Sequence, residues 1–258
     1  MGKFKEDLGL ALELAGHADV VTMHRFEASD LSVKEKPDMS PVSDADLTCE
    51  KHIRESLKRS RPRDEVLGEE YGGEACYKGR QWVIDPIDGT RSFSSAVPLY
   101  GVLLTLEDAG RPLLGCVHFP PIGQTLVAAR GAGAWLNGAR AHASACDDLS
   151  AARVVTSGLE YWRDHGTDAT RAGWDRLMRA TRFARTWGDA FGYYLVATGR
   201  AEIFADPICG QYYDYAAFEV IIPEAGGRLT QFDGSPVGTM TTAIAANAPL
   251  HDAARALL

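Results

Sequence analysis

The chain has 258 residues, 45% of them hydrophobic and 24% charged, which is typical of an ordinary globular protein with one large domain or two subdomains that share a core. Its formal net charge of -8 disfavours nucleic acid and anionic membrane surfaces as partners. The 5 cysteines are widely spaced and form no C-x-x-C pair, so they predict reduced thiols in a cytoplasmic protein.

Two helices are predicted before the first strand. Acidic residues interrupt the N-terminal segment, which is therefore expected to be neither a signal peptide nor a membrane span. Apolar residues recur there at helical spacing over residues 4–15, with Leu12 on the apolar stripe. A second helix is expected over residues 43–61, because Ser43 can cap it and Asp46 follows three residues later. Its apolar stripe consists of Cys49, Ile53 and Leu57.

A run of strands follows these helices. Residues 82–84 predict a short buried strand, and the pair Asn137-Gly138 is a strong signal for a type I′ hairpin. This hairpin excludes a plain βαβαβ sheet, so the first half is expected to be α+β. Further strands are expected over residues 101–108, 112–119 and 124–130.

Strands and helices alternate in the second half, which indicates an α/β layer. The junction is expected near residues 138–152. It would divide the chain into a subdomain of residues 1–145 with most of the candidate site and one of residues 146–258 with Asp214 and the specificity elements. The expected strands are 152–158, 183–187, 201–206, 228–232 and 241–247, and the expected helices are 172–181, 189–199, 212–227 and 249–258.

Carboxylates are concentrated where strands end or helices begin. Glu69 and Glu70 follow the strand-like "VLG", Asp85 and Asp88 close the strand in "WVIDPIDGT", and Asp214 opens a helix in "YYDYAA". Acids this close repel one another unless a cation lies between them. With no histidine or thiolate beside them, they favour Mg²⁺ or Mn²⁺ over Zn²⁺. Taken singly, Glu70 is expected to be a solvated neighbour and Asp214 could be an ordinary first-turn acid.

The turn after Asp88 offers a place for an anion. Gly89 and Thr90 present backbone N–H groups at the start of a helix, where a phosphate is favoured. Metal ions beside such a turn predict metal-assisted hydrolysis of a phosphate ester.

The order of these motifs resembles the inositol monophosphatase superfamily. The chain carries G-E-E, then W-x-x-D-P-I-D-G-T, then D-x-A-A followed by E-A-G-G, and the likeness extends to "KPDMSPVSDAD" and "LVATGRAEIF". This resemblance implies a layered αβαβα sandwich and a Mg²⁺-dependent, lithium-sensitive phosphomonoesterase that forms a homodimer. A small phosphorylated molecule would be its substrate.

The resemblance also implies which residues would hold two or three Mg²⁺ ions, with Mn²⁺ as an alternative. Glu69, Asp85 and the carbonyl of Ile87 would hold the first ion. Asp85, Asp88 and Asp214 would hold the second, so that Asp85 bridges the two.

Catalytic roles follow from the same resemblance. Thr90, hydrogen-bonded to Asp46, would orient and help deprotonate a metal-bound water, with Glu69 completing the catalytic set. The amides of Gly89 and Thr90 would hold the phosphate. Lys36 matches a lysine of the early motif, or it is only a surface cation.

The alcohol part of the substrate depends on other positions. Gly188-Asp189, "RPRDEVLGEEYGG" and "GRQWVIDPIDGT" resemble the bacterial histidinol-phosphatase branch. Asp189 and Asp206 could pair with the ammonium and imidazole groups of L-histidinol phosphate in histidine biosynthesis. Asp88 and Asp214 are further candidate substrate-binding residues. The alternative is an inositol-1-phosphate or broad sugar-phosphate phosphatase, in which Asp189 is only the N-cap of the next helix.

Aromatic residues near these acids leave further alternatives. Tyr213 stands where the superfamily usually has tryptophan, which keeps an aromatic wall but adds a hydroxyl. Trp162, with Tyr161 and Arg163, could line the site or belong to the edge of the core. A catalytically dead scaffold is disfavoured because every expected ligand is present.

Overall fold

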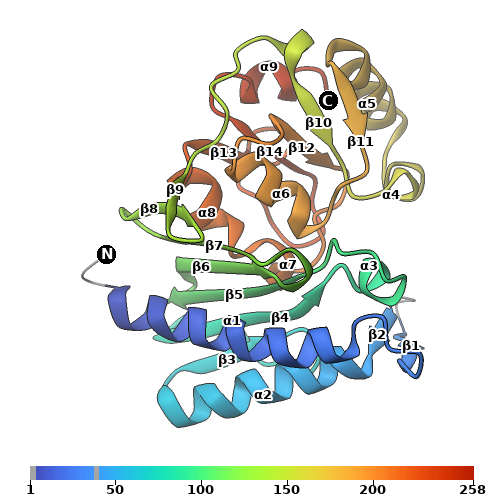
Figure 1. Cartoon of the computed structure of the whole chain (residues 1–258). Helices are drawn as coiled ribbons and strands as arrows, with labels where there is room; N and C mark the ends of the chain where they lie inside the picture. Colours follow the sequence, from blue (N-terminus) through green and yellow to red (C-terminus); the bar gives the residue numbers. More distant parts are fainter. Residues whose placement is uncertain (1–3, 38–40) are drawn as a thin grey trace.

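The computed structural model describes residues 4–37 and 41–258 and is built in layers: helix, sheet, helix, sheet, helix (Figure 1). Helices α1 and α2 cover the outer face of a seven-stranded sheet, and α6 and α8 lie between this sheet and a five-stranded one. Helices α5 and α9 cover the far face of the second sheet. The predicted αβαβα sandwich is confirmed. The helices are α1 (Lys5–Arg25), α2 (Asp44–Ser60), α3 (Thr90–Ser94), α4 (Leu159–Asp164), α5 (Asp168–Ala180), α6 (Ala190–Ala197), α7 (Tyr212–Tyr215), α8 (Phe218–Glu224) and α9 (His251–Arg255).

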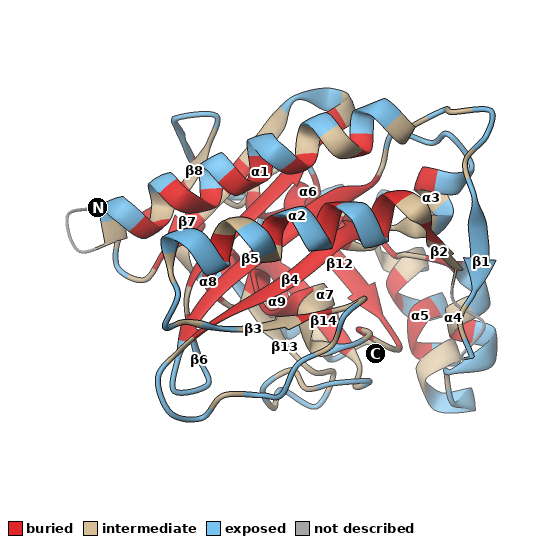
Figure 2. Cartoon of the chain, turned by 90° about the horizontal axis from the view of Figure 1, so that it is seen from below, coloured by how far each residue is buried: buried red, intermediate tan, exposed pale blue. Residues whose placement is uncertain are grey.

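The two N-terminal helices were predicted, and the stripe of α1 was wrong only at Leu12, which is 47% exposed. Ala15 of that stripe is buried and Leu8 packs against the core, while α1 also buries Leu10, Ala11, Leu14 and Ala18. The predicted stripe of α2 is confirmed, because Cys49, Ile53 and Leu57 are all buried. Figure 2 shows both helices with one buried and one exposed face.

The seven-stranded sheet has the order β3-β4-β5-β6-β7-β8-β9 and is antiparallel except for the parallel pair β3 and β4. Asn137 and Gly138 both have positive φ (48° and 83°) between β8 and β9, which confirms the predicted hairpin turn. The strands are β3 (Glu65–Gly68), β4 (Arg80–Asp88), β5 (Gly101–Asp108), β6 (Arg111–Phe119), β7 (Gln124–Ala129), β8 (Gly133–Leu136) and β9 (Ala139–Ala141).

The five-stranded sheet has the order β11-β10-β12-β14-β13 and is mixed. Strand β10 is parallel to both β11 and β12, whereas β14 is antiparallel to its neighbours. The carboxyl ends of β10 and β12 therefore lie at the same edge, which faces the candidate site. The strands are β10 (Arg153–Val155), β11 (Phe183–Arg185), β12 (Ile203–Asp206), β13 (Gly227–Thr230) and β14 (Ala243–Asn247).

The structure differs from the prediction over residues 212–227. One helix was expected there, but the segment forms α7 and α8, separated by Ala216 and Ala217. This break packs tightly against the first sheet, since a Cβ added to Gly115 of β6 would lie 2.4 Å from the carbonyl oxygen of Ala217. Helix α4 and a small ribbon of β1 (Val33–Glu35) and β2 (Pro41–Ser43) lay outside the predicted elements, whereas α3 begins at Thr90, where the start of a helix was predicted.

The largest core cluster fills the middle layer. It joins side chains of the first sheet, such as Val117 and Phe119, to Phe204 and Ala245 of the second sheet through α6 and α8. The cysteines form no disulfide, as expected, and Cys49, Cys116 and Cys209 are buried. No helix within the described ranges combines the length and apolar character of a membrane span.

Candidate active site

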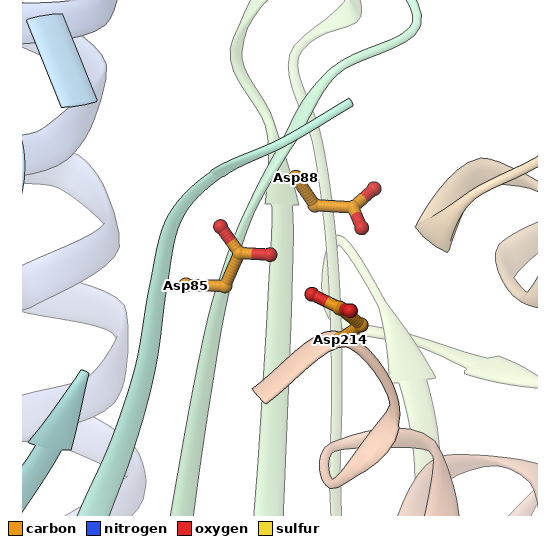
Figure 3. A group of neighbouring side chains, drawn as sticks. All are labelled: Asp85, Asp88 and Asp214. Carbon is orange, nitrogen blue, oxygen red and sulfur yellow. The ribbon is translucent and has the colours of Figure 1, made fainter. Parts of the chain in front are cut away.

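Two carboxylates leave the end of β4 on the same side of the chain. The pairing of β4 with β5 shifts between Asp85 and Asp88, at the segment that contains Pro86. Residues three apart in a regular strand point to opposite faces, so this irregularity lets both side chains point into one space (Figure 3). Asp85 is 1% exposed and Asp88 is 7% exposed.

The third carboxylate comes from the second half of the chain. Asp214 lies in α7, and one oxygen each of Asp85, Asp88 and Asp214 lies within 4.8 Å of the others (Figure 3). Its Oδ2 accepts a hydrogen bond from the backbone N–H of Gln211 at 2.6 Å, which fixes the carboxylate at the start of the helix. Gly210 is required beside it, because a Cβ there would lie 2.0 Å from Asp214 Oδ2.

These acids are held where their charged forms are unfavourable. Burial raises the pKa of Asp85 and Asp88 well above the ordinary value, and the neighbouring carboxylates raise both further. Burial followed by the charge of Glu69 raises the pKa of Asp214 to about 8. Three neighbouring carboxylates that repel one another, two of them buried and one half-buried, fit a hard divalent cation, which would stabilise their ionised forms.

The carboxylates of Glu69 and Glu70 both pair with the ammonium group of Lys36. Lys36 Nζ lies 2.8 Å from an oxygen of each, and only 20% of the lysine side chain is exposed. Glu70 is not the solvated neighbour that was expected, because its side chain is 4% exposed and burial raises its pKa to about 7. Lys36 is likewise no free surface cation, since both glutamates raise its pKa despite burial.

Thr90 and Asp46 meet as predicted. Thr90 Oγ1 lies 3.3 Å from Asp46 Oδ1 and 3.1 Å from the carbonyl oxygen of Ile87. Asp46 is positioned by the predicted capping box of α2, in which its Oδ2 accepts hydrogen bonds from the N–H and the hydroxyl of Ser43. Burial raises the pKa of Asp46 to about 6.

Gly89 forms the turn between β4 and α3. Its φ of 81° is in the left-handed region that favours glycine, and an added Cβ would lie 3.2 Å from the carbonyl oxygen of Leu99. The same Cβ position is 3.7 Å from Asp189 Oδ2, so the carboxylate of Asp189 lies beside the turn.

Asp189 is at the N-cap position of α6, but its side chain makes no capping hydrogen bond. Asp88 supplies that bond instead, since its Oδ2 accepts from the N–H of Ala190 at 2.8 Å. The interpretation of Asp189 as a helix cap is therefore wrong. Burial raises its pKa, and the hydroxyl of Ser157, followed by the nearby guanidinium of Arg91, opposes this shift.

Asp206 lies at the carboxyl end of β12 and already has several donors. It accepts hydrogen bonds from the hydroxyls of Thr156 and Ser157, and from the N–H of Ser157 at 2.9 Å. Burial nevertheless raises its pKa to about 7. Its two oxygens are thus engaged within the second half of the chain.

A cavity of 540 Å³ connects these groups across the two halves of the chain. Tyr161 lines it, and its hydroxyl accepts a hydrogen bond from Arg91 at 3.1 Å. Trp162 is core instead, stacked on Trp174 with ring centroids 4.6 Å apart, and Arg163 lines a separate groove. Among the residues that the sequence proposed for the site, the following line this cavity: Glu69, Asp85, Ile87, Asp88, Gly89, Thr90, Asp189, Asp206, Tyr213 and Asp214.

Known proteins resemble this chain over nearly its whole length. The model of the inositol monophosphatase family matches residues 5–258. The chain belongs to the inositol monophosphatase family. A histidinol-phosphatase of Mycobacterium tuberculosis is 42% identical over 96% of this chain and 95% of its own, and an inositol monophosphatase of Mesembryanthemum crystallinum is 31% identical over 94% and 92%. The solved structure of Thermotoga maritima IMPase has a TM-score of 0.87 and 27% identity, covering 98% of this chain and 96% of its own.

Inositol monophosphatase family members are generally metal-dependent phosphoric monoester hydrolases, and this site fits that chemistry. Its acidic cluster provides oxygen ligands, and the turn at Gly89 lies beside them in the same cavity.

Several residues that line the cavity were not predicted from the sequence. Ser157, Arg91 and His165 line the cavity, yet none belongs to a motif that was singled out. Ser157 follows β10, and the carboxyl ends of adjacent parallel strands are common binding positions. Recognising that β10 and β12 are parallel neighbours would therefore have indicated Ser157, but that pairing is a tertiary fact.

Proposed function

We propose that this phosphoric monoester hydrolase acts on L-histidinol phosphate and releases histidinol and phosphate. The proposal rests on the carboxylate of Asp189, which faces the cavity beside Gly89 instead of capping α6. The 42% identity to a histidinol-phosphatase over nearly the full chain supports it. The substrate carries an ammonium and an imidazole group, and a half-buried carboxylate that lines the cavity favours such a cation over a neutral polyol.

The acidic cluster would hold two or three Mg²⁺ ions, with Mn²⁺ as the alternative. Glu69, Asp85 and the Ile87 carbonyl form one ligand set, and Asp85, Asp88 and Asp214 form the other, around the oxygens that lie within 4.8 Å of one another. When bound, such ions supply Lewis acidity at phosphoryl oxygens and lower the pKa of water.

Thr90 and Asp46 would orient and deprotonate the attacking water. Thr90 Oγ1 donates its proton toward Asp46 Oδ1, 3.3 Å away, and so leaves a lone pair that can accept a hydrogen bond from water. The raised pKa of Asp46, about 6, suits a proton acceptor near neutral pH. Glu69 would complete this catalytic set, and the N–H groups of Gly89 and Thr90 would hold the phosphate.

At the other end of the substrate, Asp189 would pair with the cationic group. Asp88 and Asp214 line the same cavity and would contact the substrate from the metal side. Asp206 also lines the cavity, and a direct contact from it stays a prediction. Homodimerisation, lithium sensitivity and a place in histidine biosynthesis likewise stay predictions from the family resemblance. A cytoplasmic location stays a prediction from the widely spaced cysteines.

The second candidate is hydrolysis of inositol-1-phosphate or a broader set of sugar phosphates. The 31% identity to an inositol monophosphatase favours it. The carboxylate of Asp189 argues against it, because a neutral polyol offers no cation for this half-buried acid in the cavity.

Phosphate release tests the two candidates side by side. With Mg²⁺ present, we expect kcat/KM for L-histidinol phosphate to exceed that for myo-inositol-1-phosphate by about a hundredfold or more. The variant Asp189→Asn should lower this ratio by roughly 10- to 100-fold, because a charge-assisted hydrogen bond contributes about 1.5–3 kcal/mol. The exposed acid Asp175, changed to Asn, is the matched control. Equal rates on both substrates, unchanged by Asp189→Asn, would disprove the proposal.

A further inference from the structure

Asp189 has an unusual backbone conformation. Its φ of 53° and ψ of -148° lie in a region that residues other than glycine rarely adopt. Such a conformation is strained for a residue other than glycine and persists only where surrounding contacts enforce it. The contacts that hold Asp189 in place are therefore informative about its use.

Ser157 provides the most direct of these contacts. Its Oγ accepts a hydrogen bond from the N–H of Asp189 at 2.7 Å. Gly188, immediately before Asp189, packs against the backbone of Ser157 so closely that an added Cβ would lie 1.9 Å from Ser157 Cα. The chain entering α6 is thus pressed onto residue 157, and the hydroxyl bonds the next amide.

Ser157 is itself fixed by Asp206. The hydroxyl of Ser157 donates to Asp206 Oδ2, and its N–H donates to Asp206 Oδ1 at 2.9 Å. Asp206 Oδ1 also accepts from the hydroxyl of Thr156, which in turn accepts from Trp162 Nε1 at 2.8 Å. Because Asp206 is 3% exposed and Thr156 and Trp162 are buried, this network is anchored in the core of the second sheet.

We propose that Ser157 is a positioning residue for substrate selection: held by Asp206, it fixes the backbone of Asp189 so that the carboxylate faces the cavity. Asp206 then acts behind Asp189, through Ser157. This inference rests on the proposed function, in which Asp189 recognises the cationic part of the substrate. The hydroxyl of Ser157 matters because it is the only group in the described part of the chain seen to bond the Asp189 amide.

Removal of the Ser157 hydroxyl should raise KM for L-histidinol phosphate more than it lowers kcat. In Ser157→Ala, we expect KM for L-histidinol phosphate to rise about five- to tenfold and kcat to change less than about twofold, the size of one lost hydrogen bond. The kinetic constants for myo-inositol-1-phosphate should stay within about twofold, since that substrate does not use Asp189. Ser150→Ala is the matched control, because Ser150 bonds only to the exposed Asp148 among the described contacts.

A double-mutant cycle separates positioning from direct contact. If Ser157 acts through Asp189, the double variant Ser157→Ala/Asp189→Asn should have the same ratio of kcat/KM values for the two substrates as Asp189→Asn alone. Additive losses in the double variant, or equal losses on both substrates, would show that Ser157 acts by another route and would overturn the inference.

Amide hydrogen exchange gives a readout that does not depend on the substrate. The Asp189 N–H should exchange at least about tenfold faster in Ser157→Ala than in the wild type, while amides of β12 keep their protection. Unchanged exchange at Asp189 would refute the inference even if kinetics changed. If the wild type shows no preference for L-histidinol phosphate, the proposed function fails, and the exchange result still decides whether Ser157 positions Asp189.

Loss of the fold in Ser157→Ala would be detected by thermal unfolding. In that case Asp206→Asn is the second variant, because it keeps the Ser157 hydroxyl but removes one acceptor oxygen that holds it. In Asp206→Asn we expect the Asp189 N–H to exchange faster than in the wild type and the substrate selectivity to fall less than in Ser157→Ala. Combined with Asp189→Asn, Asp206→Asn should cause no further loss of selectivity. Wild-type exchange and selectivity would overturn the inference.

Discussion

Asp85 owes its chemistry to neighbours that come from distant parts of the chain. It is buried at the end of β4, and the charges of Glu69, Asp88 and Asp214 act on it in addition to burial. An acid in this position keeps its charge only if a cation compensates it. Its carboxylate also shapes the backbone, since Asp85 Oδ1 accepts a hydrogen bond from the N–H of Ile87 at 3.1 Å and so fixes the turn that leads to Asp88.

The change Asp85→Asn tests this arrangement. We expect it to lower kcat by about a thousandfold or more, because the proposed bridging ligand loses its charge and metal ions contribute several kcal/mol to such reactions. Titration calorimetry with Mn²⁺ should also show weaker binding, independently of turnover. Asp175→Asn serves as the control, and wild-type phosphate release from Asp85→Asn would contradict the two-metal assignment.

At the scale of elements, α2 supports the site at two points. Its N-terminal capping box positions Asp46, and its middle carries Glu50, which is 0% exposed. Glu50 accepts hydrogen bonds from the N–H groups of Glu70 at 2.7 Å and Tyr71 at 3.2 Å, and pairs with Arg54 at 2.7 Å. The turn that carries Glu69 is therefore attached to α2 by a buried carboxylate.

Removing the charge of Glu50 should loosen this turn. For Glu50→Gln we expect Mn²⁺ affinity to fall by about tenfold or more, as is usual for groups that orient metal ligands. The free energy of unfolding should fall by about 1–3 kcal/mol, because buried donors lose an acceptor. Calorimetry and thermal unfolding measure the two effects. The exposed Glu55 of the same helix, changed to Gln, is the control, and equal Mn²⁺ affinity in both variants would show that Glu50 has no such role.

At the scale of the whole molecule, the site joins the two predicted subdomains. The metal side comes mostly from β3, β4 and α3, whereas Asp214 and Asp189 come from α7 and from the start of α6. The middle core also takes side chains from both sheets. The division at residues 145 and 146 stays a prediction about folding units, and this shared core suggests to us that each unit depends on the other.

The clustered carboxylates make the free energy of unfolding depend on pH and on bound metal ions. The pKa of Asp214 is raised to about 8 and that of Asp206 to about 7, with Asp85 and Asp88 also raised. The folded state therefore binds more protons than the unfolded state above the ordinary pKa of these acids. Stability contributed by these groups is present at low pH and is lost as pH rises through the raised values.

We therefore expect the melting temperature in EDTA to fall between about pH 5 and pH 8, and Mg²⁺ to reduce this fall by compensating the ionised carboxylates. Thermal unfolding in EDTA and in Mg²⁺ measures both slopes. Asp214→Asn should flatten the EDTA slope, because the group with the raised pKa is gone. A melting temperature in EDTA that rises with pH, or an unchanged slope in Asp214→Asn, would contradict the prediction.

Much of the local structure could be predicted from short segments. The hairpin at Asn137-Gly138 and the capping box of Ser43 and Asp46 depend on a few adjacent residues, and both are confirmed. Leu12 was wrongly assigned to the buried stripe of α1 because it fits the helical period as well as its buried neighbours do. Only the packing of α1 on the sheet chooses between such faces.

The sequence by itself determined the helix cap at Ser43 and the crowding of acids in "DPIDGT", because backbone preferences and burial patterns act over a few residues. The layered fold was implied by the resemblance of its motifs to the inositol monophosphatase superfamily. The tertiary structure alone decided that Asp88 caps α6 from 102 positions away, that Asp189 is thereby free to face the cavity, and that Glu70 is buried against Lys36. These outcomes depend on which distant elements pack together, since the partner of a polar side chain is set by its neighbours in space.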